Sequence, residues 1–238
     1  MGVKFIKVKV ELVTKTQGVN KYEGLTSEEI VAAIARHGII KEDKGRVVKY
    51  LMDNKHWSPL DMINFSFEIE TSRAIGRQLL RHWSIHPQEH SQRYSDRVQF
   101  EPIELRREHP TNRQSSTEVI GTVNIDEEGW EFEGNHDSPA YNAIIKAADS
   151  LVRMEEAYRE MVLNKVAKET ARMFLPEACR TTMTMNGTLR SWLAFLNVRA
   201  EEHTQKEARI VAEFIGEALE KEMPKVFEQI DWRNGLFM

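Results

Sequence analysis

The stretch INFSFEIETSRAIGRQLLRHWSIHPQEHSQRY, residues 63–94, decides the fold. Apolar residues occupy every second position over residues 63–69, and this period of two predicts a strand with one buried face. Over residues 71–82 the spacing changes to that of a helix, because Ile75 and Leu79 fall one turn apart on one face. A strand that leads into a helix indicates a chain with both kinds of element.

The same stretch gathers planar, multi-donor side chains around Pro87, where a helix cannot continue, so residues 88–94 are predicted to form a loop or a new turn. Such side chains suit phosphate groups and the edges of heterocyclic rings better than Lys and Glu do. They are Arg81, His82 and His86 before the proline, then Glu89, Ser91, Gln92 and Arg93 after it. The stretch therefore predicts a site for a small anionic ring compound.

Periodicity predicts strands and helices in mixed order over the rest of the chain. Strands are expected over residues 6–12 and 180–185, and a hairpin over 119–132. Helices are expected from a capping box at Thr26 and Glu29, and over residues 47–52, 140–174 with a break near Asn164, 188–198 and 204–222. Residues 97–117 are polar and are expected to form a mobile surface segment. These elements predict an α+β fold, with residues 1–238 as a single domain.

The composition bounds the class of protein. With 238 residues, of which 41% are hydrophobic, the chain can bury a full core. It contains no run of about 18 apolar residues and no leader-like N-terminal segment, so a soluble protein that stays in the cytoplasm is expected. The one cysteine, Cys179, fits a reducing compartment, and the net charge of -4 argues against a general polyanion binder.

Four blocks of sequence lie in a recognisable order. Arg81-His82-Trp83 is followed, after seven residues, by Ser91. HWSPLD stands at residues 56–61, ETARMFLP at 169–176, and TLRSWLAFLNVR at 188–199. Together they resemble the flavin-dependent thymidylate synthases, whose signature is Arg-His-Arg, seven residues, then Ser. The resemblance covers residues 56–205, and residues 1–50 and 100–140 add little to it.

The resemblance implies an α+β fold, with an antiparallel sheet flanked by long helices, and a methyltransferase that converts dUMP to dTMP by reductive methylation. Methylenetetrahydrofolate would give the carbon, and FAD reduced by NADPH would give the hydride. The resemblance also implies a homotetramer whose sites are shared between subunits. Its location would be the cytoplasm of a cell or of a viral host, with neither nucleic acid nor a membrane as partner.

The resemblance implies three groups of site residues. The catalytic residues are His56, in a supporting role, and Arg199, whose fixed charge would stabilise negative charge that develops on the pyrimidine. The FAD contacts are Ser58, Arg81, His82, Trp83, Glu89, Thr188, Leu189, Arg190 and Ala194. The dUMP contacts are Gln78, Leu79, Leu80, Arg81, Glu89, His90, Ser91, Gln92, Arg93, Arg172 and Arg199. No metal ligand is implied.

Two residues depart from the family pattern. Trp83 stands where the signature has its second arginine, and Ala194 stands where the family has Asn or His beside the flavin. An indole can stack on a ring but cannot neutralise a pyrophosphate. Both departures are expected to change FAD affinity more than dUMP binding.

Other interpretations stay open from the sequence. The histidines at every fourth position from His82 to His90 could hold a metal in a hydrolase. The arginine-rich residues 73–113 could bind nucleic acid, although the acidic net charge argues against it. Arg172 and Glu169 could form an ordinary ion pair on a helix surface. The chain could also be a relative that binds dUMP and has lost the chemistry.

Overall fold

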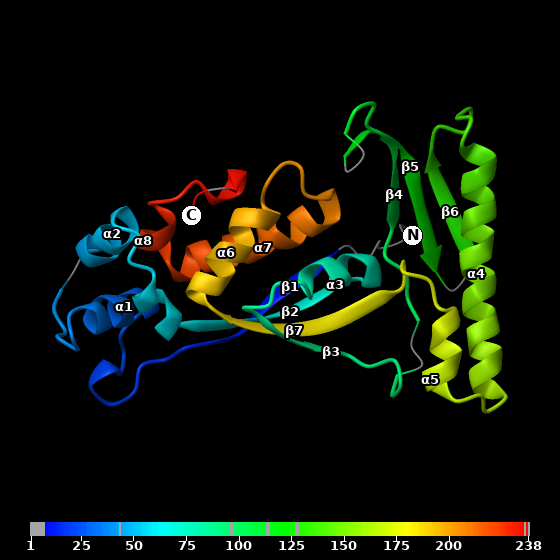
Figure 1. Cartoon of the computed structure of the whole chain (residues 1–238). Coiled ribbons are helices and arrows are strands. Elements are labelled where there is room, and N and C mark those ends of the chain that lie inside the picture. The colour runs from blue at the N-terminus through cyan, green and yellow to red at the C-terminus, as the bar shows by residue number, and fades with distance from the viewer. Residues whose placement is uncertain are drawn as a thin grey trace, which may run out of the picture. The chain divides into compact units, whose positions relative to one another are not determined.

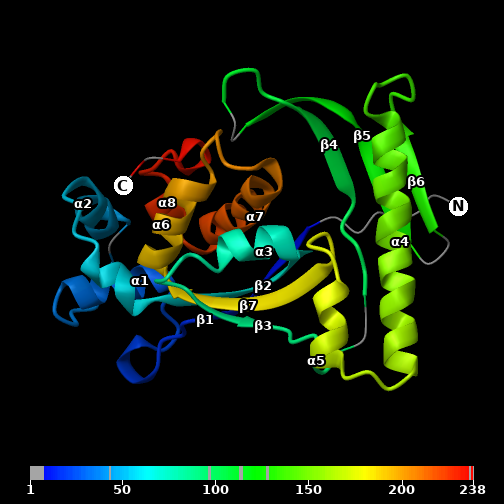
Figure 2. The same ribbon diagram turned by 45° about the vertical axis from the view of Figure 1, so that its right-hand side comes forward.

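The computed structural model describes residues 8–42, 44–95, 98–112, 115–126, 129–235 and 237. Over these residues the chain divides into two compact units. Unit 1 consists of Val8, Glu70–Gln78 and Glu89–Thr182, and unit 2 consists of Lys9–Ile69, Leu79–Gln88 and Met183–Met238. Helices and strands both occur in quantity (Figures 1 and 2), which confirms the predicted α+β class. The prediction of a single domain stays a prediction.

A four-stranded sheet supplies the framework of unit 2. Its order is β1 (Lys9–Lys15), β2 (Asn64–Ser72), β7 (Arg180–Thr188) and β3 (His86–Glu89). The division between the units falls within β2, β3 and β7. The alternating apolar side chains of residues 63–69 are fully buried, at 0% exposure, so the strand prediction is confirmed. The predicted strand over residues 6–12 is confirmed from Lys9, and its first two residues lie outside the described part of the chain.

Helix α6 (Leu189–Arg199) is fixed to β2 by its tryptophan. The Trp192 indole N–H donates to the carbonyl oxygen of Phe65 at 3.0 Å, and the Trp192 ring meets the Phe67 ring edge-on with centroids 5.0 Å apart. In both ribbon views, α6 and α7 (Lys206–Glu222) lie on the same side of the sheet (Figures 1 and 2). Packing in the core therefore sets where both ends of α6 lie.

Among the smaller helices of unit 2, α1 (Ser27–Ala35) begins where the sequence predicts. The Glu29 N–H donates to the Thr26 hydroxyl at 3.2 Å, and the Thr26 N–H donates to the Glu29 carboxylate at 2.8 Å, so the predicted capping box is confirmed. These helices are α1 (Ser27–Ala35), α2 (Arg46–Asp53) and α8 (Pro224–Phe227), with short 3-10 turns η1 (Asn20–Tyr22), η2 (Ser58–Met62) and η4 (Trp232–Asn234).

Unit 1 contains a three-stranded antiparallel sheet covered by a long helix. The strands β4 (Ile103–Glu108), β5 (Ser116–Asp126) and β6 (Gly129–Gly134) lie in that order. Helix α4 (Tyr141–Leu163) runs along the sheet in both views (Figures 1 and 2). A cluster of buried residues joins them, namely Val123, Phe132, Ile144 and Ala148. The predicted hairpin over residues 119–132 is confirmed as β5 and β6.

Helix α4 stops at the predicted break. The Asn164 side-chain amide donates to the Glu160 carbonyl oxygen at 2.8 Å, and Lys165 takes a left-handed φ of 65°. The chain then continues as α5 (Lys168–Ala171) and the 3-10 turn η3 (Arg172–Phe174). The Glu160 carbonyl thus accepts from both the main chain and the side chain of Asn164, and the positive φ of the next residue ends the helix.

The helix predicted over residues 71–82 is shorter than expected, because α3 covers only Arg73–Leu79. At its start, the Ser72 N–H donates to the buried carboxylate of Glu101 at 2.7 Å, which keeps Ser72 in β2. At its end, the His82 N–H donates to the Leu79 carbonyl oxygen at 3.1 Å, so the chain leaves the helix in a turn. Neither partner can be inferred from helical periodicity.

One prediction of irregular structure is wrong. Residues 97–117, expected to be a mobile surface segment, contain strand β4, and within them Phe100 bridges to Cys179 while Glu101 is only 7% exposed. Pairing with other parts of the chain overrides the local polar pattern there. The loop or turn predicted over residues 88–94 is confirmed from His90 onward, since only its first two residues lie in β3.

Within the described residues, no helix is both long enough and apolar enough to cross a bilayer.

We predict that Gly216→Ala destabilises the protein, although alanine is the better helix former by about 1 kcal/mol. A Cβ at this position of α7 would collide with the buried indole of Trp232. Overpacking of this kind lowers the free energy of unfolding by about 1–3 kcal/mol. Denaturant titration of Gly216→Ala, alone and combined with Trp232→Leu, checks this. An equal effect of the alanine in both backgrounds would contradict the collision.

Candidate functional site

The predicted site residues fall in both units, and each group is described within its own unit. In unit 2 lie His56, Ser58, Leu79, Leu80, Arg81, His82, Trp83, Thr188, Leu189, Arg190, Ala194 and Arg199. In unit 1 lie Gln78, Glu89, His90, Ser91, Gln92, Arg93 and Arg172.

The structure brings His82 and Arg199 together in unit 2. Arg199 is the last residue of α6, and its Nε donates to Nε2 of His82 at 2.9 Å. The imidazole also packs against Phe195, with ring centroids 4.8 Å apart. Because a guanidinium has donors and no acceptor, this contact requires Nε2 of His82 to be unprotonated. The ring is therefore neutral, with its proton on Nδ1.

The electrostatics agree with a neutral imidazole. Burial, and then the positive charge of Arg199, lower the pKa of His82 from 6.5 to about 4. Burial, and then the neighbouring charge of Arg81, also lower the pKa of Arg199. Two guanidinium groups and a neutral ring thus share one region, and a bound anion would relieve the repulsion between the two charges. This arrangement favours an anionic ligand over a cationic one.

A second group of predicted residues surrounds the start of α6. The Thr188 hydroxyl donates to Oδ1 of Asp61 at 3.1 Å and caps the helix by accepting the Ser191 N–H at 3.1 Å. Arg190 donates from Nη1 to Oδ2 of the same Asp61 at 3.1 Å. Asp61 received no role from the sequence, although it ends the block at residues 56–61. Its carboxylate fixes two predicted FAD contacts.

Not every predicted contact can act through its side chain. Leu79 and Leu189 are fully buried, main chain included, so neither presents a group to a ligand in this structure. His56 is exposed, and its ring meets the Tyr50 ring edge-on at 5.7 Å between centroids. The Trp83 side chain is 91% exposed.

In unit 1, the residues that follow β3 are held by partners that the sequence did not single out. Oε1 of Gln92 accepts from the Arg73 guanidinium, and Oε1 of Glu89 accepts from the Thr181 hydroxyl at 2.6 Å. The main chain of His90 donates to the carbonyl oxygen of Thr182 at 2.8 Å. These contacts fix residues 89–92 against the start of β7 and the start of α3.

Arg93 forms an ion pair with Glu169, with Nη2 and Oε2 3.1 Å apart. The sequence instead suggested that Glu169 could pair with Arg172. Both side chains of the Arg93 pair are about half exposed, so the pair is weak and an anion can displace the carboxylate. Arg172 begins the turn η3 and is half-buried.

The alternative of a metal-dependent hydrolase finds no support in the described residues. Nowhere in this part of the chain do three or more His, Cys, Asp or Glu side chains come together as metal ligands. His82 directs its Nε2 toward Arg199, and His86 lies in β3 rather than on a helix with it.

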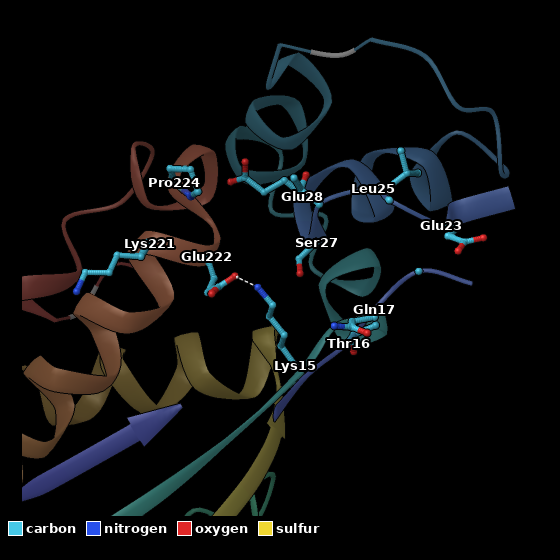
Figure 3. A pocket seen from close by; sticks show the side chains of 13 residues that line it. Lys15, Thr16, Gln17, Glu23, Leu25, Ser27, Glu28, Lys221, Glu222 and Pro224 are labelled. Atoms are coloured by element: carbon cyan, nitrogen blue, oxygen red, sulfur yellow. Dashed lines mark hydrogen bonds and ion pairs between the residues drawn. The ribbon is translucent and has the colours of Figure 1, made fainter. Parts of the chain in front are cut away.

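A pocket of about 600 Å³ lies elsewhere in unit 2, between the end of β1, the start of α1 and the end of α7 (Figure 3). None of the predicted site residues lines it. Its Lys15 pairs with Glu222 at 2.6 Å, as the figure shows. The lining also contains Lys221, Glu23 and Glu28, so its three carboxylates outnumber its two ammonium groups. This pocket is therefore poorly suited to a phosphate.

Comparison with known proteins identifies the family of this chain. The family model described as thymidylate synthase complementing protein matches residues 13–225. The chain is 33% identical over 238 residues to a probable flavin-dependent thymidylate synthase of Paramecium bursaria Chlorella virus 1, covering 98% of this chain and 100% of the relative. It is 31% identical over 235 residues to the flavin-dependent thymidylate synthase of a Synechocystis species, with 98% and 100% covered. The chain belongs to the flavin-dependent thymidylate synthase family.

We predict that acid destabilises the wild-type protein more than it destabilises His82→Gln. His82 takes up a proton near pH 6.5 when unfolded but only near pH 4 when folded, so the unfolded state binds more protons between these values. The stability present above pH 6.5 is then lost as the pH falls toward about 4. Denaturant titrations at several pH values check this, and parallel pH profiles for the two proteins would contradict it.

Proposed function

We propose that the protein catalyses the reductive methylation of dUMP to dTMP. The observation that carries this proposal is the guanidinium of Arg199, half-buried at the end of α6, held by a neutral imidazole and placed near a second guanidinium. A fixed positive charge of this kind stabilises negative charge that develops on a pyrimidine ring and so activates its C5 carbon. The family membership supports the same reaction.

Arg93 and Arg172 are the proposed phosphate ligands. A phosphate dianion binds best to guanidinium forks, and Arg93 exchanges one anionic partner, Glu169, for another. Gln92 and Glu89 are proposed to hold the nucleoside, since Arg73 and Thr181 already fix their side chains. The protein is proposed to act as a homotetramer in the cytoplasm, with different subunits contributing to each site. Residues 1–238 are proposed to form a single domain.

The residues around the signature fit a flavin dinucleotide. Trp83 offers an exposed aromatic face, and the neighbouring Arg81 offers a guanidinium for phosphate. Thr188 and Arg190 lie at the start of α6, where the positive end of the helix dipole favours negative charge. When bound, FAD supplies the hydride after reduction by NADPH, while methylenetetrahydrofolate supplies the carbon. The chain's own residues orient the flat partners and exclude other geometries.

We predict that Arg199→Ala lowers turnover about a hundredfold, since one charge-stabilising donor is lost. The wild-type protein should show a flavin spectrum that shifts when dUMP is added, and the variant should keep the spectrum without the shift. Arg107→Ala is the matched control, because Arg107 is exposed and pairs with the exposed Glu118 across β4 and β5. Full turnover by Arg199→Ala, or a wild-type protein that binds neither FAD nor dUMP, would contradict the proposed function.

We predict that Trp83→Arg tightens FAD binding roughly tenfold, because a guanidinium adds a charge-assisted hydrogen bond to phosphate. The exposure of Trp83 means that the change should leave the fold intact. FAD titration followed by absorbance measures the effect, and Trp83→Ala reports the contribution of the indole itself. Weaker binding by both variants would show that the indole already makes a compensating contact.

A further inference from the structure

The unprotonated ring nitrogen of His82 accepts a hydrogen bond from another side chain of the protein. The family resemblance implies that this histidine contacts FAD, yet its Nε2 lies 2.9 Å from Nε of Arg199 and accepts a hydrogen bond from it. The acceptor of the ring is thus directed at the guanidinium proposed to act on the pyrimidine. The Nδ1–H is then the one hydrogen-bond donor of the neutral ring.

His82 is itself held in place. The main-chain N–H of His82 donates to the Leu79 carbonyl oxygen at 3.1 Å, and the His82 carbonyl oxygen accepts from the Ile85 N–H at 3.0 Å. Its ring packs against Phe195, which is fully buried and lies four residues before Arg199 on α6. Residues four apart share one face of a helix, so the ring rests on the face that carries both Phe195 and Arg199.

This support matters because Arg199 is the last residue of α6. A long side chain at a helix end can adopt many rotamers, and fixing an arginine costs about 2 kcal/mol of conformational entropy. A hydrogen bond at Nε fixes the plane of the guanidinium and commits one edge of the fork. The edge formed by Nη1 and Nη2 then faces a defined direction, as bidentate binding of a ligand requires.

We propose that His82 is a positioning residue that orients the guanidinium of Arg199 for the pyrimidine, an inference that rests on the proposed function. His82 acts through Arg199 and need not touch the nucleotide. The unprotonated state of the ring keeps the acceptor available at neutral pH, since burial and the charge of Arg199 lower the pKa of His82 to about 4.

Two substitutions separate this role from a flavin contact and from packing. His82→Gln places an amide oxygen near the position of Nε2 and keeps an acceptor for Arg199. His82→Phe keeps a ring against Phe195 and removes the acceptor. Thermal unfolding first establishes that both variants are folded. FAD affinity, dUMP affinity of the FAD-loaded protein and turnover are then measured for each.

Positioning predicts that His82→Phe loses about tenfold in dUMP affinity and in turnover at unchanged FAD affinity, the usual size of a lost hydrogen bond to a charged group. His82→Gln should restore most of both. In an Arg199→Ala background, His82→Phe should have no further effect on dUMP binding, since the residue through which it acts is gone.

Additive effects of His82→Phe and Arg199→Ala would overturn the proposal, as would a loss confined to FAD affinity. If the wild-type protein binds dUMP and turns over while the variants behave in either of these ways, only the positioning role is refuted. A wild-type protein that does not bind dUMP would refute the proposed function, and the positioning role with it.

Discussion

The packing of α6 against β2 is the interaction on which the rest of unit 2 depends. The Trp192 indole is fully buried, and its N–H is bonded to the main chain of β2 through Phe65. The first turn of α6 carries Arg190 beside Asp61, and its last residue is Arg199 beside His82. Arg190 and Arg199 stand nine residues apart on this helix, so it holds the two charged ends about 14 Å apart along its axis. The buried packing of Trp192 thus fixes the positions of the charged residues at both ends of α6.

Local patterns predicted the elements whose causes are local. The alternation over residues 63–69 predicted β2, the Thr26 and Glu29 pair predicted the start of α1, and Asn164 marked the end of α4. The residues 97–117 were misread because their order comes from partners far along the chain. The buried carboxylate of Glu101 binds the end of β2, and no periodicity within the segment indicates that.

The site shows the same limit. Motif resemblance identified Arg199 and His82, since their type and spacing are written in the sequence, but it could not show that they bind one another. Arg73 and Thr181 were missed because they act on Gln92 and Glu89 only after the chain has folded. Asp61 was within reach of sequence reasoning, because it closes the block at residues 56–61. Its carboxylate received no role because its partners, Thr188 and Arg190, lie far along the chain.

The contact between Gly216 and Trp232 bears on how this sequence can diverge. Positions near the end of a chain usually accept substitution freely, because few neighbours depend on them. Trp232 is only 2% exposed, and its ring fills the notch left by a glycine in the middle of α7. A larger residue at position 216 would clash with the Trp232 ring, and a smaller residue at position 232 would leave a void, so neither position can change alone. Among related sequences, these two positions should therefore change as a pair or stay fixed, as if they belonged to the innermost core.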